Sequence, residues 1–256
     1  MKTIAIIPSR MGARRLPGKP MIDIQGMPML GHVYYRTKLC MDIDEVYVAT
    51  CDEEIKTYIE SIGGKVIMTS KDHLRSTDRV AEALRIIEKQ EKGQIEIVVM
   101  VQGDEPLVNP DMIANSISPI LIDKSIEIVS LMSEVKDENE ANDNNCVKVV
   151  CDFNNFALYL SRSNIPYQNR GIAGLPTLKK VNVVAMKRGL LFYYNSLEPT
   201  PLELVESIGI LRVLEHGGKV KMVLSDTYTV SVDTQKDLEI VKDMMKDDYW
   251  FGRYRQ

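Results

Sequence analysis

Continuous apolar runs alternate with amphipathic stretches through the first half of the chain. A continuous run is typical of a strand buried on both faces, whereas helices repeat apolar positions every three to four residues. The runs predict strands at Ile4–Ile7, Glu45–Ala49, Lys65–Met68, Ile95–Val101 and Glu127–Leu131. Helical spacing predicts helices at Met29–Leu39, Glu53–Ile62 and Thr77–Glu88, and Pro110 opens another. This alternation indicates parallel βαβ units in a doubly wound, mostly parallel sheet, an α/β fold.

Helix boundaries carry local signals. Gly63-Gly64 stands where a helix C-terminus favours glycine. Ser76 or Thr77 is available as the N-cap of the third helix, because a short hydroxyl side chain can accept a hydrogen bond from the first turn.

The pattern changes from about Val147. Val147–Val150 and Phe156–Leu160 predict shorter, antiparallel strands, and a loop with Pro166, Gly171, Gly174 and Pro176 follows. We expect residues 146–186 to form a small antiparallel insertion that serves as a dimerisation arm, within one domain spanning 1–256. Beyond it we expect a helix at Pro201–Glu215, a strand at Lys219–Leu224 and a closing helix at Asp237–Met245.

Composition narrows the class of protein. Of 256 residues, 45% are hydrophobic and 27% charged, as in a soluble globular domain. The net charge of −4 argues against a general nucleic-acid binder, which needs a basic face. The four cysteines have no CxxC spacing and predict free thiols in a reducing, cytoplasmic setting. No apolar stretch approaches the ~18 residues of a membrane span.

The loop Pro8–Pro20 follows the first predicted strand, at the sheet edge where open α/β folds bind ligands. Gly12 and Gly18 let backbone N–H groups approach phosphate oxygens closely. Four cations fall within ten residues: Arg10, Arg14, Arg15 and Lys19. The loop matches neither GxxxxGK[ST] nor GxGxxG, so it predicts a triphosphate site that is neither a P-loop nor a dinucleotide site. A solvated basic turn is the alternative.

Two carboxylates are placed to meet at the same edge. Asp104 follows the strongest strand in Val101-Gln-Gly-Asp-Glu-Pro106, and Gln102 offers an amide to a substrate. Asp233 ends a short predicted strand in Val230-Ser-Val-Asp-Thr234. Together they predict a Mg²⁺ site suited to attack at an α-phosphate. Asp104 could instead cap its turn, and Asp233 could be the N-cap of the last helix.

Four motifs in this order resemble the CMP-Kdo synthetase family, the 3-deoxy-manno-octulosonate cytidylyltransferases. They are Ile-Pro-Ser-Arg with Arg-Leu-Pro-Gly-Lys-Pro, Val-Gln-Gly-Asp-Glu-Pro, Ser161-Arg-Ser-Asn-Ile-Pro166, and Val232-Asp-Thr with Asp-Leu238. The first is shared with other sugar nucleotidyltransferases, whereas the combination is specific and covers nearly the whole chain.

The resemblance implies a homodimer that transfers CMP from CTP to the anomeric hydroxyl of a 2-keto sugar acid and releases pyrophosphate, a step of lipopolysaccharide biosynthesis. It implies catalytic roles for Arg15, Lys19, Asp104 and Asp233, with both carboxylates binding Mg²⁺. The CTP site would comprise Pro8, Ser9, Arg10, Arg15, Lys19, Arg75, Ser76, Thr77 and Gln102. The acidic acceptor would face Gln102, Arg162, Lys180 and Ile210.

The chain departs from the family mainly on the acceptor side. The family's Ser-Gly-Thr before Asp/Glu-Arg reads Arg75-Ser-Thr77 here, which adds a cation beside the base. The family's His-Val-Gly-Ile-Tyr reads Lys180-Val-Asn-Val-Val184, and its Glu-Gln before Leu-Arg reads Gly209-Ile210. A site that binds hydroxyls discriminates through such polar groups, so a deoxy, amino or acylated ulosonic acid suits this less polar wall.

Three alternatives remain open from the sequence. The acceptor could be a nonulosonic acid or a phosphonate. The enzyme could use UTP or a thymidine nucleotide. The chain could also be a catalytically silent nucleotide-binding protein, although the presence of Lys19, Asp104 and Asp233 argues against that.

Overall fold

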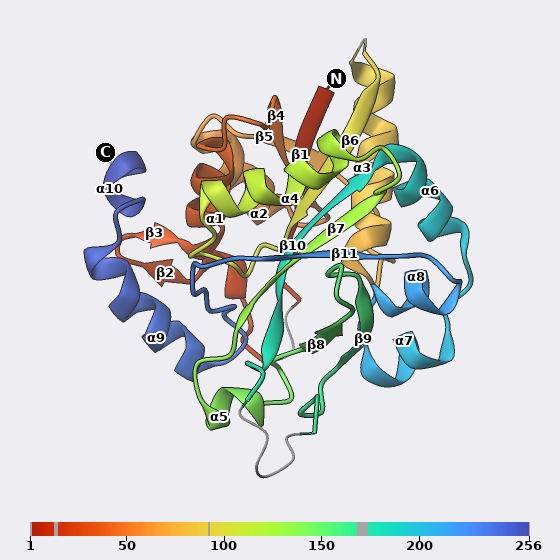
Figure 1. Ribbon diagram of the computed structural model, residues 1–256. Helices are drawn as coiled ribbons and strands as arrows, with labels where there is room; N and C mark the ends of the chain where they lie inside the picture. The colour runs from red at the N-terminus through yellow and green to blue at the C-terminus, as the bar shows by residue number, and fades with distance from the viewer. Residues whose placement is uncertain (1, 13–14, 92, 168–173, 256) are drawn as a thin grey trace.

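A mixed sheet with helices on both faces forms the body of the protein in a computed structural model, which describes residues 2–12, 15–91, 93–167 and 174–255 (Figure 1). The strands of the main sheet are β1 Lys2–Pro8, β4 Glu45–Thr50, β5 Lys65–Met68, β6 Ile95–Val101, β7 Ile128–Glu134, β8 Lys148–Cys151, β9 Ala157–Ser161, β10 Leu178–Lys187 and β11 Lys221–Leu224. A small hairpin joins β2 Asp23–Ile24 to β3 Met27–Pro28.

The helices follow the predicted order through the first half. They are η1 Lys19–Met21, α1 Met29–Lys38, α2 Glu53–Ser61, α3 Ser76–Gln90, α4 Pro110–Ile122, α5 Glu138–Ala141, α6 Arg188–Ser196, α7 Pro201–Glu206, α8 Leu211–Glu215, α9 Gln235–Met244, η2 Met245–Asp247 and α10 Phe251–Tyr254. None of the helices in the described ranges is long and apolar enough to cross a bilayer.

The sheet order is β11-β7-β10-β6-β1-β4-β5, and within this path only β10 runs antiparallel to its neighbours. The prediction of a doubly wound, mostly parallel α/β sheet is therefore confirmed. In β1 the side chains of Ile4 and Ile6 join one core and those of Ala5 and Ile7 the other, as the two-residue period of a strand requires. Helices α3, α6 and α8 cover the first face, and α1, α2 and α4 the second.

The segment 146–186, predicted to be a single antiparallel insertion, is divided between the main path of the sheet and a branch from it. Strands β8 and β9 pair with each other and branch from β10, as predicted. Strand β10, which the sequence did not predict, lies in the main sheet between β7 and β6. Among the described residues, only β8 and β9 thus lie off the main path of the sheet, and residues 168–173, with Gly171, lie outside the described residues.

Two helix predictions need correction. The helix predicted over 201–215 is two helices, because Ser207 adopts a left-handed conformation (φ 55°) that ends α7. Helix α3 begins at Ser76, with Arg75 as its N-cap and no side-chain cap, so neither Ser76 nor Thr77 is the N-cap. The cysteines are free thiols, as expected.

Candidate active site

The loop after β1 reaches the carboxyl edge of the sheet and turns at Gly18, whose positive φ of 69° favours glycine. The turn places Lys19 at the start of η1. The Gly103 backbone approaches this loop so closely that a Cβ there would lie 3.2 Å from the Pro8 carbonyl oxygen. The loops after β1 and β6 therefore pack directly against each other. Arg14 lies outside the described residues.

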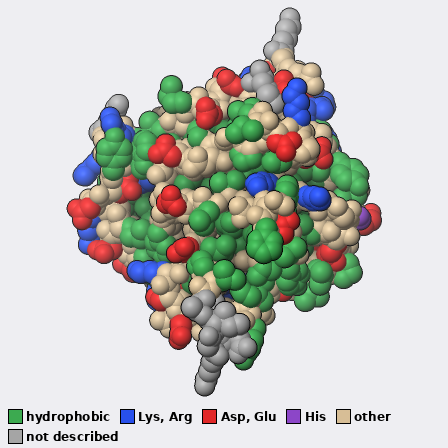
Figure 2. All heavy atoms as spheres, in the orientation of Figure 1, with side chains coloured by type: hydrophobic (Ala, Val, Ile, Leu, Met, Phe, Trp, Pro, Cys, Tyr) green, Lys and Arg blue, Asp and Glu red, His purple; other side chains and the backbone are tan. Residues whose placement is uncertain are grey.

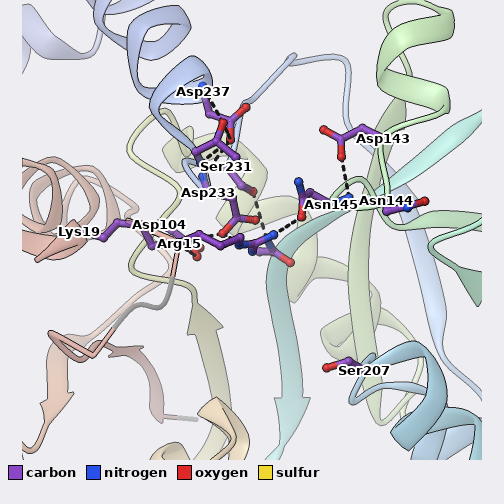
Figure 3. Close-up of polar contacts among 12 residues, drawn as sticks. Arg15, Lys19, Asp104, Asp143, Asn144, Asn145, Ser207, Ser231, Asp233 and Asp237 are labelled. Atoms are coloured by element: carbon purple, nitrogen blue, oxygen red, sulfur yellow. Dashed lines mark hydrogen bonds and ion pairs between the residues drawn. The ribbon is translucent and has the colours of Figure 1, made fainter. Parts of the chain in front are cut away.

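Four charged side chains from three distant segments converge at this edge (Figure 3). Lys19 Nζ lies 2.8 Å from Asp104 Oδ2 and 3.1 Å from Asp233 Oδ1, and Arg15 reaches the same Asp233 oxygen at 2.8 Å. A backbone hydrogen bond of 2.9 Å, from Val232 N to Asp104 O, holds the two acidic segments together. The meeting of Asp104 and Asp233 that the sequence predicts is present.

The two carboxylates govern the protonation of Lys19. Burial alone lowers the pKa of this ammonium, but the charges of Asp104 and Asp233 and their hydrogen bonds outweigh burial and raise the pKa above its usual value. Lys19 is therefore a permanent cation at neutral pH, suited to an anionic ligand rather than to proton transfer.

Asp104 has an oxygen available for a cation. Its Oδ1 is buried and has no hydrogen-bond partner among the described residues. A Mg²⁺ ion needs oxygen ligands and commonly takes one or two carboxylates, with water and phosphate for the rest. Asp104 and Asp233 fit that requirement, although no cluster of three or more His, Cys, Asp or Glu side chains suited to a metal occurs in the described ranges.

This charge cluster opens into a cavity of about 690 Å³, which we call the basic cavity. Its lining includes Pro8, Ser9, Arg10, Arg15, Lys19, Arg75, Ser76, Arg79, Gln102, Asp104 and Asp233. The cations on its wall outnumber the two carboxylates, so it suits a polyanion such as a triphosphate.

A second cavity of about 380 Å³, the apolar cavity, adjoins the basic cavity. The two share the side chains of Leu74, Arg75, Ser76, Gln102 and Ser207 as a common wall. The apolar cavity also takes in Thr77, Arg162, Lys180 and Ile210, together with aliphatic side chains such as Met100, Val184 and Val213. All the residues predicted from the sequence thus line one cavity or both.

Arg162 is held in the wall of the apolar cavity by main-chain carbonyls. Its guanidinium donates to the carbonyl of Glu206 at 2.7 Å, of Asn144 at 2.8 Å and of Ser207 at 3.4 Å. The Glu206 carboxylate accepts the Arg162 backbone N–H at 2.9 Å and the Ser161 hydroxyl at 2.6 Å. Arg162 is therefore a fixed cation with three of its five donors in use.

Lys180 donates to Asn182 Oδ1 at 2.8 Å. Burial lowers the pKa of its ammonium to about 8, against the opposing charges of Glu105 and Asp104. Asn182 in turn donates to Ser231 at 3.1 Å, and Ser231 donates to buried Glu105. Burial, followed by the neighbouring charge of Asp104, raises the pKa of Glu105 to about 7.

Asp233 is positioned differently from the prediction. The segment Val230–Val232 is not a strand. The backbone hydrogen bond from Val232 N to Asp104 O and the hydrogen bonds of the Ser231 hydroxyl with Asn182 and Glu105 hold it in place. Nor is Asp233 the N-cap of the last helix, because Thr234 holds that place in a capping box with Asp237. The carboxylate of Asp233 therefore pairs with Arg15 and Lys19 rather than capping the helix.

Sequence reasoning missed several residues of the site. Arg79 is buried on the wall of the basic cavity, with one guanidinium nitrogen lacking a hydrogen-bond partner. The Asn145 side-chain oxygen accepts a hydrogen bond from Arg15, as Figure 3 shows. The third missed residue is Glu203, which is buried beside Arg75. Arg79 is only two residues from Thr77, and this closeness could have indicated that it belongs to the site. The sequence offers no such indication for Asn145 and Glu203, because tertiary contacts bring them there.

The family model described as cytidylyltransferase matches residues 4–224. A 3-deoxy-manno-octulosonate cytidylyltransferase of Geotalea daltonii is 38% identical, over 96% of this chain and 99% of the relative. An 8-amino-3,8-dideoxy-manno-octulosonate cytidylyltransferase of Shewanella pealeana is also 38% identical, over 94% and 97%. The solved structure of CMP:2-keto-3-deoxy-manno-octonic acid synthetase complexed with CTP superposes with a TM-score of 0.87 at 35% identity, covering 96% of this chain and 99% of that one.

Proposed function

The chain belongs to the cytidylyltransferase family and is an enzyme of that class, and on this premise we propose that it transfers CMP from CTP to a 2-keto-3-deoxy sugar acid with release of pyrophosphate. The acceptor would be Kdo (3-deoxy-manno-octulosonate) or a modified ulosonic acid. Full-length relatives named for Kdo and for its 8-amino analogue, and a structural neighbour complexed with CTP, support this choice.

The observation that carries the proposal is the shared wall between the two cavities. A triphosphate in the basic cavity would lie beside an acceptor in the apolar cavity, across Arg75, Ser76 and Gln102. Holding two reactants side by side converts a bimolecular reaction into an effectively unimolecular one. Lys19 and Arg15 stand at the edge of the basic cavity, where they can bind phosphate oxygens.

We assign magnesium to Asp104 and Asp233, as the available Asp104 oxygen supports. The ion would neutralise charge that develops on the phosphates as the nucleotide is attacked. Lys19 and Arg15 supply the counter-charges for the two carboxylates. An ion bound there would free Lys19 and Arg15 to bind the triphosphate.

The apolar cavity limits the acceptor. Arg162, Lys180 and Gln102 supply cationic and amide groups for an acid, whereas Ile210 and the aliphatic lining offer few partners for hydroxyls. Burying hydroxyls without partners is costly, so the site favours an acceptor with a hydroxyl removed or replaced. A deoxy ulosonic acid fits that description.

We also propose that the enzyme is a homodimer. Hydrophobic side chains gather over β9 and α7 on the face shown in Figure 2. Leu158, Leu204 and Val205 are 64%, 61% and 83% exposed there. A contiguous exposed apolar face favours contact with another protein surface, and the resemblance to a dimeric family favours a second copy of this chain.

A panel of acceptors tests the proposed function. We expect pyrophosphate release from CTP and Mg²⁺ with Kdo or 8-amino-Kdo, and none with a nonulosonic acid or a phosphonate. Replacing CTP with UTP should abolish release, because the exocyclic amine of cytosine is lost. Turnover with a phosphonate but with no 2-keto acid would contradict the proposal.

A further inference from the structure

Arg75 occupies the wall that the two cavities share, and among the described residues no other arginine is on both linings. It precedes α3 as the N-cap residue, and its side chain is 29% exposed. This position gives a cation access to both the proposed nucleotide and the proposed acceptor.

Glu203, the carboxylate beside Arg75, is hydrogen-bonded through both of its oxygens to another arginine, Arg212. Arg212 Nε lies 2.7 Å from Glu203 Oε2, and Arg212 Nη2 lies 2.9 Å from Oε1. This bidentate pair is buried, with 2% of each side chain exposed. The remaining Arg212 nitrogen donates to the carbonyls of Leu197 at 3.0 Å and Tyr194 at 3.3 Å. Arg212 and Glu203 therefore satisfy each other without Arg75.

Arg75 is a surplus charge in this group. Its Nη1 lies 3.2 Å from Glu203 Oε1, and its guanidinium has no further hydrogen bond to the described residues. The guanidinium groups of Arg75 and Arg212 therefore both face the single carboxylate of Glu203. A guanidinium with free donors and a partner that does not depend on it is well placed to bind an incoming carboxylate bidentately.

The other cations on the apolar cavity are less available. Arg162 uses three donors on main-chain carbonyls, and Lys180 donates to Asn182. Lys180 also carries a lowered pKa, so part of its charge is lost just above neutral pH. Arg75 makes a single side-chain contact, with Glu203, among the described residues.

We infer that Arg75 is a specificity-determining residue that binds the carboxylate of the acceptor and so selects acids over neutral sugars. The inference rests on the proposed function, since it assigns a residue to the acceptor of that reaction. Arg75 would exchange its contact with Glu203 for the acceptor carboxylate, and Glu203 would keep both bonds to Arg212.

The test compares an acid with its neutral ester in two enzymes. Kdo and Kdo methyl ester are titrated as acceptors at saturating CTP and Mg²⁺, with the wild type and with Arg75→Ser. Arg85→Ser removes the same charge from an exposed position of α3 and serves as the control. Thermal melting of all three proteins reports on the fold, and we expect Tm shifts below about 3 °C because Arg212 still pairs with Glu203.

We expect the wild type and Arg85→Ser to prefer the acid over the ester by at least about tenfold in kcat/KM. Arg75→Ser should lose most of that preference through a higher KM for Kdo, and the KM for CTP should rise by a smaller factor than the KM for Kdo, because Arg75 also lines the basic cavity. An unchanged preference, or a rise in the KM for CTP alone, would overturn the inference and leave the proposed function standing. A wild type that transfers CMP to no ulosonic acid would overturn both.

Discussion

Lys19 bridges two carboxylates that would otherwise repel each other at the edge of the sheet. With Arg15 included, two cations balance Asp104 and Asp233, so these four side chains carry no net charge together. A triphosphate brings more negative charge than this cluster can balance, and a divalent cation at the carboxylates would restore the balance. Under the proposed function, the cluster would couple nucleotide binding to metal binding through these four side chains.

The first residue-scale prediction concerns Asp104. Asp104→Asn removes a metal ligand, so turnover with CTP and the acceptor should fall by about 10³-fold, equivalent to about 4 kcal/mol of transition-state stabilisation. The free energy of unfolding should change by less than about 1 kcal/mol, because Lys19 retains Asp233. Asp226→Asn, at an exposed position, is the control. Equal turnover in Asp104→Asn would refute the metal role.

The second concerns His32. The imidazole is buried between the Tyr254 hydroxyl and the Ile24 carbonyl, each 2.8 Å away. Burial lowers its pKa from 6.5 to about 4; the Ile24 carbonyl and Asp23 oppose this shift and Arg36 reinforces it. The unfolded chain binds the proton near pH 6.5 but the folded protein only near pH 4, so stability is full above pH 6.5 and falls between these values.

His32→Gln removes this titration. Urea unfolding at pH 7.5 and 4.5 should show that the stability advantage of the wild type over His32→Gln shrinks by about 2–3 kcal/mol at the lower pH. His216→Gln, at an exposed site, should show no such pH-dependent difference. A difference in stability that is the same at both pH values would mean that His32 has the same pKa in the folded and the unfolded protein, and would contradict this prediction.

At the scale of elements, α7 fixes the insertion to the site. The Glu206 carboxylate at the end of α7 accepts from the Tyr159 and Ser161 hydroxyls of β9 and from the Arg162 backbone. This contact sets the position of Arg162 on the apolar cavity. The geometry of the acceptor side thus depends on a helix and a strand that are distant in sequence.

Glu206→Ala removes that contact. We expect a loss of about 2 kcal/mol in the free energy of unfolding, typical of removing hydrogen bonds to a charged group. The KM for the acceptor should rise while the KM for CTP stays near the wild-type value, because Arg15 and Lys19 are untouched. Glu198→Ala, exposed and without side-chain hydrogen bonds in the described ranges, should change neither. Equal rises in both KM values would contradict this role of α7.

Elements with a strong local signal were predictable, and those that depend on distant partners were not. Strand β6 is apolar at every position except Glu96 and was predicted at its observed bounds. Strand β10 was missed because Lys179, Lys180 and Asn182 interrupt its apolar residues. Its buried Lys179 is satisfied only by Glu140 and the Thr229 carbonyl, which lie far away in sequence.

The site shows the same division. Arg15, Lys19, Asp104 and Asp233 stand in motifs that follow strands or precede a helix, so their shared edge could be predicted from the order of the elements. The Arg75–Glu203–Arg212 group could not, because Glu203 belongs to a helix whose packing on the loop before α3 leaves no local pattern.

At the scale of the whole molecule, the proposed homodimer predicts the mass in solution. Light scattering should give twice the 29.0 kDa of one chain. Val205→Lys on α7 should weaken the dimer, because it places a charge in an apolar contact. Ile122→Lys on α4, equally exposed at 82%, is the control. A monomeric wild type would contradict the proposed assembly.

The product of a single reaction tests the central claim most directly. Wild-type enzyme with CTP, Mg²⁺ and either Kdo or 8-amino-Kdo should yield the CMP ester of that acid and pyrophosphate in equal amounts, identified by mass spectrometry. Pyrophosphate that appears with free CMP and unchanged acid, or CTP that remains intact with both acids, would contradict the account.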